Sequence, residues 1–230
     1  MALVPYCIFL LDEVEVPSTG IQGSPVLLLT EGELSVMYSE IAEPQQLTGD
    51  RLQGAALDFH RTVHAIFAHR AVIPFRFPTL LSETELREHL RSQAVPYQNF
   101  LRDHANEVQM EVRLWPFNSA PLKRGTTGTE YLEGRIAGEA RMLPLGDTLG
   151  GLPGVREVRR IPSRDLTRFF ALVDRKHLEE FRTKAQERFP AGNIRMRVTG
   201  PWPATEFLPR SEHSAAAPRR VSSITRGEKP

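Results

Sequence analysis

Apolar and polar positions in the first part of the chain change their period several times. Residues 4–11 are almost continuously apolar and predict a buried strand. Residues 26–30 and 34–41, joined by the short turn Glu31-Gly32-Glu33, predict a hairpin of two further strands. From Leu52 to His69 the apolar residues instead fall three and four positions apart, which predicts an amphipathic helix.

The segment that follows this helix is strand-like but carries two prolines. Because proline offers no N–H to a neighbouring strand, residues 72–80 predict an edge strand. Ser82-Glu83-Thr84-Glu85 then supplies an N-cap with early carboxylates and predicts a helix. This helix is expected to break near Pro96, with a second helical piece running to Asn106. Residues 1–105 therefore predict an N-terminal α+β domain with the order βββαβα.

The second part of the chain contains four strand patterns. Residues 107–114 alternate between apolar and polar side chains, as half-buried strands do, and residues 155–161 are interpreted as a second alternating strand. Residues 166–173 are mostly apolar and predict a central strand. Alternation returns at residues 194–198, which predict the last strand.

Helices are predicted between these strands. Residues 129–142 can form one helix, whereas four glycines and two prolines between Pro144 and Gly154 predict an irregular segment. Asp174 is expected to cap a second helix that ends at a glycine. The order over residues 106–208 is therefore βαββαβ, the ferredoxin-like plan, in which the first and last strands are neighbours. The fold class predicted is α+β with two domains.

Composition limits the classes of protein that fit this fold. The chain has 230 residues with 29 basic and 28 acidic side chains, so it lacks the positive excess of a strong nucleic-acid binder. Its single cysteine, Cys7, lies in an apolar run and is expected to be a small buried residue. No apolar stretch reaches the roughly 20 residues of a membrane helix, which predicts a cytoplasmic protein. Residues 209–230 lack apolar periodicity and predict a disordered tail.

Residues with catalytic or metal-binding potential are few. His60 and His64 would share one helix face, with His69 a turn further on, but a zinc site needs a third and a fourth ligand that this pattern does not supply. Phosphate-binding loops and nucleophile elbows are absent from the sequence. No carboxylate lies in the apolar setting that raises a pKa for general acid catalysis. The sequence therefore predicts no enzyme, no cofactor and no metal.

An RNA-binding module is the alternative from another class, because the RNA-recognition motif shares the ferredoxin-like plan. Residues 168–173 occupy the predicted third strand as Arg-Phe-Phe-Ala-Leu-Val, with the glycine missing and leucine in place of the second aromatic. The last strand adds Arg195 and Arg197. These two arginines can instead meet Glu107 and Glu111 on the neighbouring first strand, which explains the pattern without RNA.

Three segments together resemble the gas-vesicle F/L protein family. The first is Val72-Ile73-Pro74-Phe75-Arg76-Phe77-Pro78-Thr79, similar to the family's Pro-x-Arg-Phe-Gly-Thr strand with proline in place of the glycine. The second is Gly128-Thr129-Glu130-Tyr131-Leu132-Glu133, similar to a Gly-x-x-Tyr-Leu helix start. The third and most specific is Thr199-Gly200-Pro201-Trp202-Pro203. Their order and spacing cover about residues 4–208.

The resemblance implies a non-enzymatic accessory protein that is cytoplasmic and associated with gas vesicles. It implies binding to the small hydrophobic shell protein, to other vesicle accessory proteins, or to both during assembly, with neither nucleic acid nor membrane as a partner. The motif residues are the candidate partner-binding or structural residues: Phe75, Arg76, Phe77, Tyr131, Leu132, Gly200, Pro201, Trp202 and Pro203.

Elementary physical chemistry gives the motif residues structural roles. Gly200 permits a turn, and the prolines beside it are expected to end strand pairing. Trp202 can then fold back and bury a large aromatic surface, acting as a clamp. Phe75 and Phe77 are expected on one side of their strand, with Arg76 on the other side anchoring a carboxylate.

Overall fold

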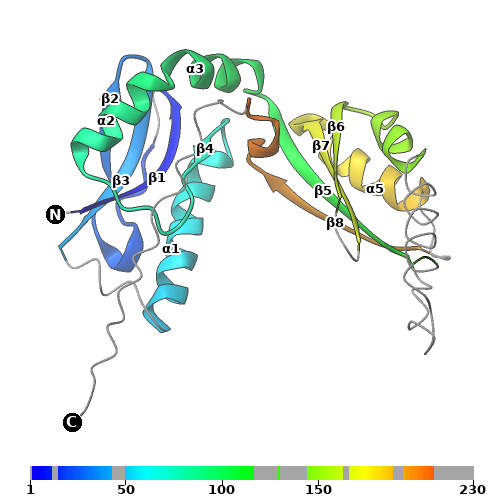
Figure 1. The fold of residues 1–230 in the computed structure, drawn as a ribbon, viewed down its shortest axis with the longest axis horizontal. Coiled ribbons are helices and arrows are strands. Elements are labelled where there is room, and N and C mark those ends of the chain that lie inside the picture. The colour runs from blue at the N-terminus through cyan, green and yellow to red at the C-terminus, as the bar shows by residue number, and fades with distance from the viewer. Residues whose placement is uncertain are drawn as a thin grey trace, which may run out of the picture.

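The protein forms two four-stranded sheets that lie in two domains joined as an arch (Figure 1). The computed structural model describes residues 2–11, 15–42, 50–116, 129, 144–162, 166–188 and 194–209. All strand pairs within these residues are antiparallel. The α+β class and the two-domain plan predicted from the sequence are confirmed, whereas the division at residue 105 stays a prediction.

The first sheet has the strand order β2-β3-β1-β4. Its strands are β1 (Ala2–Leu10), β2 (Leu27–Glu31), β3 (Leu34–Ile41) and β4 (Ile73–Pro74). β4 lies at the edge as expected but is much shorter than the predicted strand 72–80. Pairing with β1 is interrupted after Pro74 and resumes at Leu81, which exchanges two hydrogen bonds with Leu3. The N–H of Phe75 still donates to the carbonyl oxygen of Tyr6, and Pro78, within the gap, has no N–H to donate.

Helices cover both faces of the first sheet (Figure 1). α1 (Asp50–Phe67) packs on one face, and α2 (Glu83–Ser92) and α3 (Ala94–Asp103) pack on the other. Ser82 and Glu85 form the capping box that the sequence predicted for α2. The break between α2 and α3 falls at Gln93 and not at Pro96, because Pro96 lies in the first turn of α3, where a missing N–H costs little.

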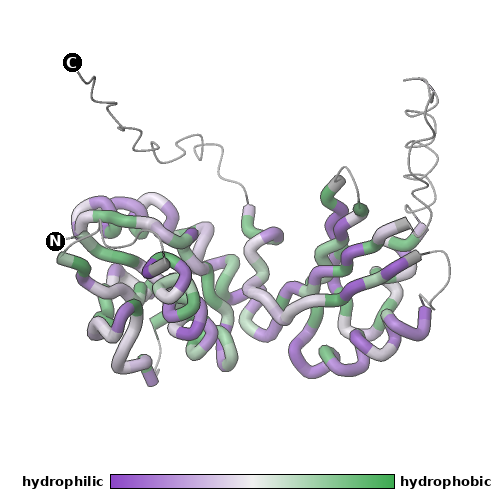
Figure 2. The backbone as a smooth tube through the Cα atoms, turned by 90° about the horizontal axis from the view of Figure 1, so that it is seen from below, coloured by the Kyte–Doolittle hydropathy of each residue, from purple (hydrophilic) through white to green (hydrophobic). Residues whose placement is uncertain are grey.

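Two hydrophobic clusters fill these faces, and hydrophobic positions follow the strands of both domains in Figure 2. We call the first the α1 cluster; it contains Tyr6, Phe9, Phe59, Val63 and Ile66 among others. We call the second the α2/α3 cluster; it contains Leu3, Leu34, Leu86, Leu90 and Phe100 among others. Cys7 is buried in the α1 cluster, as the sequence predicted.

The second sheet has the strand order β6-β7-β5-β8. Its strands are β5 (Glu107–Pro116), β6 (Val155–Pro162), β7 (Thr167–Asp174) and β8 (Ile194–Trp202). β5 and β8, the first and last strands of this domain, are neighbours, which is the ferredoxin-like arrangement predicted from the sequence. α5 (Leu178–Arg188) packs on one face of the sheet through Phe181 and Ala185.

The segment predicted to be irregular contains a helix. Residues 144–150 are helical, contrary to the expectation from their glycines and prolines. Leu149 and Leu152 are buried beside the second sheet, and Gly146 lies against the Phe169 ring, so tertiary packing outweighs the low helix propensity. The helix predicted over 129–142 lies outside the described residues, apart from residue 129. Asp174 caps a short 3-10 turn, Arg175–His177, that precedes α5.

The two domains share their hydrophobic packing. Phe170 and Leu172 of β7, together with Phe207 of the 3-10 turn Thr205–Phe207, join the α2/α3 cluster of the first domain. Val108 of β5 joins the α1 cluster. Three residues, 104–106, connect α3 to β5, so no long linker separates the domains.

Candidate interaction surface

The first motif connects both hydrophobic clusters of the first domain. Phe75 packs in the α2/α3 cluster, with its ring centroid 5.7 Å from that of His89. Phe77 packs in the α1 cluster, 5.2 Å from the ring of Phe59. The expectation that both rings share one side is therefore wrong, because the strand ends at Pro74 and the chain then turns between the two faces.

Arg76 lies between Phe75 and Phe77 in the sequence, and its side chain is exposed. No ion pair joins it to a carboxylate among the residues that the structure describes, so the expected anchoring role is not observed there. Tyr131 and Leu132 of the second motif lie outside the described residues.

The third motif forms a bulge in β8 and not a turn. Gly200 has φ +123°, and a Cβ atom there would lie 2.9 Å from the carbonyl oxygen of Gln109. This close approach to β5 requires glycine. The register with β5 shifts at this point, and pairing continues beyond Pro201 to Trp202, opposite Gln109. Pro201 therefore does not end the pairing, because the bulge absorbs the extra residue, whereas the strand does stop at Trp202, directly before Pro203.

Trp202 does not act as the buried clamp that the sequence predicted. Its exposed fraction is 39%, and its ring lies 6.2 Å from that of His60 on α1. Phe207, a few residues further on, is the buried aromatic side chain. Trp202 thus lies at the seam between the domains with one part of its ring accessible.

The segment that carries Phe207 is hydrogen-bonded to the second sheet. The backbone N–H of Glu206 donates to Oε1 of Gln109 at 3.0 Å, and Arg159 donates to the carbonyl oxygen of Glu206 at 2.6 Å. The Arg159 guanidinium also lies 4.8 Å from the centre of the Phe207 ring. Residues 205–207 are therefore fixed between the two domains.

Arg175 links the second domain to the end of α1. Its guanidinium donates to the carbonyl oxygens of Phe67 at 2.7 Å, Arg70 at 3.0 Å and Ala68 at 3.3 Å, and lies 4.7 Å from the centre of the Phe67 ring. Carbonyl groups at a helix C-terminus lack intrahelical partners and favour a cation. Burial lowers the pKa of Arg175 from its ordinary value. No local pattern in the sequence indicates this contact, because it joins residues more than a hundred positions apart.

Two buried carboxylates of β5 are paired, but not with the arginines expected from the sequence. Glu111 accepts hydrogen bonds from Arg168 at 2.6 Å and Arg113 at 2.8 Å. Burial raises the pKa of Glu111, but the two arginines outweigh this effect and leave the pKa below its ordinary value.

Glu107 pairs with Arg156 at 2.6 Å and with Nδ1 of His104 at 2.7 Å. The predicted partners, Arg195 and Arg197, lie opposite Trp115 and Arg113 instead, as the β5–β8 register dictates.

The histidines of α1 lie close together without forming a metal site. The rings of His60 and His64 are 6.0 Å apart. In the described ranges no group of three or more His, Cys, Asp or Glu side chains is arranged to hold a metal ion.

A hollow of about 360 Å³ near the domain junction is lined by charged residues. Glu107 is already paired there, and the carboxylate of Asp174 accepts from the N–H of Lys176. The hydrogen bond from Lys176 lowers the pKa of Asp174. Both carboxylates thus have a cationic partner, Arg156 for Glu107 and Lys176 for Asp174.

The outer edge of β2 is the clearest free edge in the first domain. In the part of the chain that the structure describes, β2 pairs with β3 on one side and with no strand on the other. Leu27 and Leu28 on this edge are 38% and 49% exposed. β2 lies on the side of the first domain away from the second domain (Figure 1).

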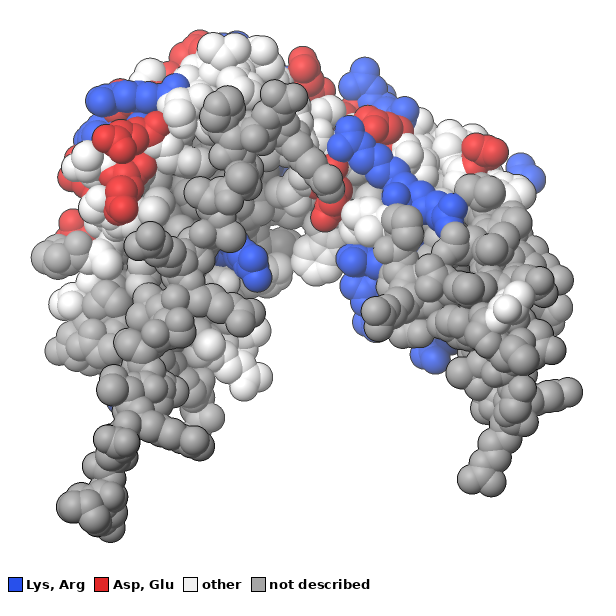
Figure 3. All heavy atoms as spheres, viewed as in Figure 1, with Lys and Arg blue, Asp and Glu red and all other residues white. Residues whose placement is uncertain are grey.

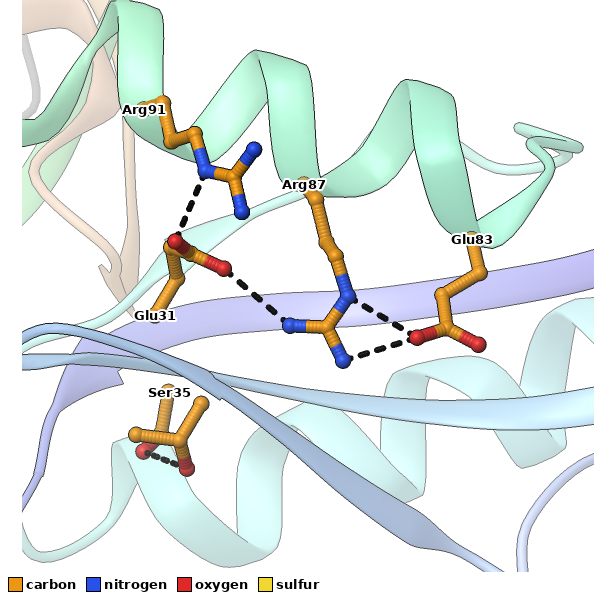
Figure 4. A network of polar contacts seen from close by, with 6 residues as sticks. Glu31, Ser35, Glu83, Arg87 and Arg91 are labelled. Atoms are coloured by element: carbon orange, nitrogen blue, oxygen red, sulfur yellow. Dashed lines mark hydrogen bonds and ion pairs between the residues drawn. The ribbon is translucent and has the colours of Figure 1, made fainter.

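The end of β2 is held by ion pairs with α2. Glu31 accepts from Arg91 at 2.7 Å and from Arg87 at 3.1 Å, and Arg87 also pairs with Glu83 (Figure 4). These hydrogen bonds from the two arginines lower the pKa of Glu31. The polar end of β2 is thus held by ion pairs, whereas Leu27 and Leu28 at its other end are exposed.

The chain is thus an α+β protein of two domains with antiparallel sheets, and the second domain has the ferredoxin-like strand order. Two solved structures are similar to it: GvpF from Anabaena sp. PCC7120 and GvpF from Microcystis aeruginosa. Each has a TM-score of 0.65 and 15% sequence identity, and each alignment covers 91% of this chain and 99% of that chain. These likenesses establish the fold.

The family model for gas vesicle synthesis protein GvpL/GvpF matches residues 3–134, more than half of the chain. The chain therefore belongs to the GvpL/GvpF family, and its role is that of a gas vesicle accessory protein. No curated protein matches the sequence. Over the described residues, no helix is long and apolar enough to cross a membrane.

Proposed function

We propose that this protein binds the hydrophobic shell protein of the gas vesicle during assembly, through the outer edge of β2. The observation that carries the proposal is the free strand edge with two exposed leucines, Leu27 and Leu28. Membership of the GvpL/GvpF family supports a partner from the gas vesicle. Binding of other vesicle accessory proteins is compatible with the same edge.

The physical argument rests on what a shell subunit exposes before it assembles. Apolar surface and unpaired strand edges are aggregation hazards in any protein, and a second strand edge can cover them by adding main-chain hydrogen bonds. β2 contains neither proline nor lysine, the residues that commonly protect a strand edge. β4, at the opposite edge of the same sheet, contains Pro74 and pairs over two residues only. The first sheet thus has one protected edge and one edge open to a partner.

The proposal is tested by replacing Leu28 with lysine in the full-length protein. Burying a leucine at an interface contributes about 1.5–3 kcal/mol, so Leu28→Lys should reduce co-purification of co-expressed shell protein by about tenfold or more. Leu57→Lys is the matched control, because Leu57 is an exposed leucine that belongs to α1 and not to β2. Equal recovery of the shell protein with wild type and Leu28→Lys would contradict the proposal.

A genetic experiment tests the accessory role separately. Cells that lack this protein should form fewer or misshapen vesicles, as counted by electron microscopy, and the wild-type gene should restore them. Normal vesicles in such cells would count against a role in assembly.

The non-enzymatic reading forms part of the same proposal. It is supported by the mutual pairing of the charged groups around Glu107, Glu111 and Asp174. The RNA-binding alternative has no support here, because Phe170 and Leu172, at the positions where an RNA-recognition motif stacks bases, are buried in the domain junction.

A further inference from the structure

The face of the second sheet that turns away from α5 carries a row of three arginines. Arg168 of β7, Arg113 of β5 and Arg197 of β8 are direct cross-strand partners, so the row crosses three adjacent strands. Neighbouring strands lie about 4.8 Å apart, which brings the three side chains close together. We call these residues the arginine row.

Residues near the row add further positive charge. Arg195 lies opposite Trp115, and its guanidinium is 5.7 Å from the centre of the tryptophan ring. Figure 3 shows basic side chains gathered on the second domain toward the inside of the arch. The arginine row and Arg195 thus form one basic surface.

Among the described residues, Glu111 is the one carboxylate that bridges these cations, through Arg113 and Arg168. Arg195 and Arg197 are exposed and have no ion pair with a described residue. Within this part of the chain, the four arginines and Glu111 leave an excess of three positive charges. Like charges directly opposite each other in a sheet are destabilising. The second sheet nevertheless places these arginines next to one another, although the whole chain is nearly neutral.

We propose that this basic surface binds an acidic segment of a partner protein. Arginine holds carboxylates through paired, parallel hydrogen bonds, and Arg195 and Arg197 are free to make them. The Nε atom of Arg113 is buried and has no hydrogen-bond partner in the described part of the chain. The surface lies in the second domain, so the proposal is independent of the β2 edge of the first domain.

Neither the C-terminal residues of the chain nor the acidic residues near β2 of a second copy fit as the acidic segment. Residues 210–230 carry five basic and two acidic side chains and would be repelled. In a second copy, the acidic residues near β2 are already paired, since Glu31 accepts from Arg87 and Arg91 (Figure 4). Glu33 pairs with Arg102. Charge complementarity therefore points to a different protein with unpaired Asp or Glu residues.

The same surface is less suited to nucleic acid. Single-stranded RNA is held by stacking bases on exposed aromatic side chains as well as by phosphate contacts. The aromatic residue of β7 on this face, Phe170, is buried. Trp115 is covered in part by the Arg195 guanidinium. Carboxylates need only the guanidinium groups that this face presents.

The test uses the full-length protein and a fluorescein-labelled peptide of twelve glutamates, with anisotropy as the readout. Arg195→Gln/Arg197→Gln should weaken binding by about tenfold at low salt, because two charge-assisted contacts are lost. Arg51→Gln/Arg188→Gln removes the same charge from exposed positions outside this face and should change the affinity less than twofold. Added salt should weaken wild-type binding.

Three results would overturn the proposal. In the first, Arg195→Gln/Arg197→Gln and Arg51→Gln/Arg188→Gln weaken peptide binding equally, which would show unspecific charge attraction. The wild type could fail to bind the peptide at all. Finally, a labelled RNA of twelve uridines could bind at least as tightly as the peptide with the same dependence on Arg195 and Arg197, which would assign the surface to RNA. Thermal unfolding of each variant verifies that the fold is intact.

Discussion

Glu111 is a buried carboxylate that two arginines keep ionised. Its pKa in the folded chain lies below the ordinary value of 4.5, because the hydrogen bonds from Arg113 and Arg168 outweigh the effect of burial. A group with a lowered pKa stabilises the fold above its ordinary pKa and loses this contribution as the pH falls through the folded value. The stabilisation by Glu111 is therefore complete at pH 7 and lost in acid.

We predict that Glu111→Gln lowers the free energy of unfolding by about 2 kcal/mol at pH 7, since it leaves two guanidinium groups without a counter-charge. The difference from wild type should shrink as the pH falls below 4.5, where the carboxylate of the unfolded chain takes up a proton, and should be lost once the pH is low enough to protonate the folded carboxylate as well. Urea unfolding at a series of pH values measures both effects. Glu157→Gln, which removes an exposed partner of Arg159, should cost less than about 0.5 kcal/mol. A constant difference at all pH values would refute the assignment.

The burial or the sheet face of a single residue was predictable where it depends on the neighbouring residues in the sequence. Alternation along residues 107–114 placed Glu111 on one face, and Cys7 followed from its apolar neighbours. The pairing of Glu111 with Arg168 was not predictable, because it depends on the register between β5 and β7, a strand that comes later in the chain. The bulge at Gly200 shifts the register between β5 and β8, and no local pattern shows it.

Arg175 determines how α1 meets the second domain. It donates three hydrogen bonds to the carbonyl groups of Phe67, Ala68 and Arg70 at the end of the helix. Lysine can replace the charge but not the planar, forked set of donors.

We predict that Arg175→Lys destabilises the protein by about 1–2 kcal/mol, because charge-assisted hydrogen bonds at the helix end are lost. Hydrogen exchange should then speed up at the amides near Phe67, where the helix end is no longer held. Lys176→Arg, one residue further along and exposed, should change neither measurement. Unchanged exchange in Arg175→Lys would show that the contact does not hold α1 in place.

Elements with a clear hydrophobic period were predictable, and the others were not. The strands of both sheets and the helices α1, α2 and α5 follow from apolar spacing and capping residues. The helix at 144–150 was missed because its stability comes from Leu149 and Leu152 packing on the second sheet. The length of β4 was overestimated, because apolar character alone does not show where prolines interrupt pairing.

Phe170 joins the two domains into one packed unit. It extends from the second sheet into the α2/α3 cluster and is only 3% exposed. A contact between residues so distant in sequence is invisible in the local pattern. Two apolar residues, Phe170 and Leu172, on the face away from α5 were the available signal that something covers this face.

We predict that the wild type unfolds in one transition and that Phe170→Ala lowers the stability by about 3–4 kcal/mol, because a large cavity forms in the junction. Loss of the shared core should also separate the unfolding of the two domains, giving two transitions in differential scanning calorimetry. Val95→Ala, at an exposed position on α3, should leave the transition unchanged. Two transitions in the wild type would mean that the domains are not coupled.

The connection between α3 and β5 is only three residues long, and it is fixed on both sides. The N–H of His104 donates to Phe100, and the carbonyl oxygen of Asn106 accepts from the N–H of Arg175. Because this connection is short and held on both sides, the distance between the two domains is set by the fold itself. Fluorescent dyes attached to the two domains should therefore show constant energy transfer. A change in energy transfer would report a rearranged connection rather than a hinge motion.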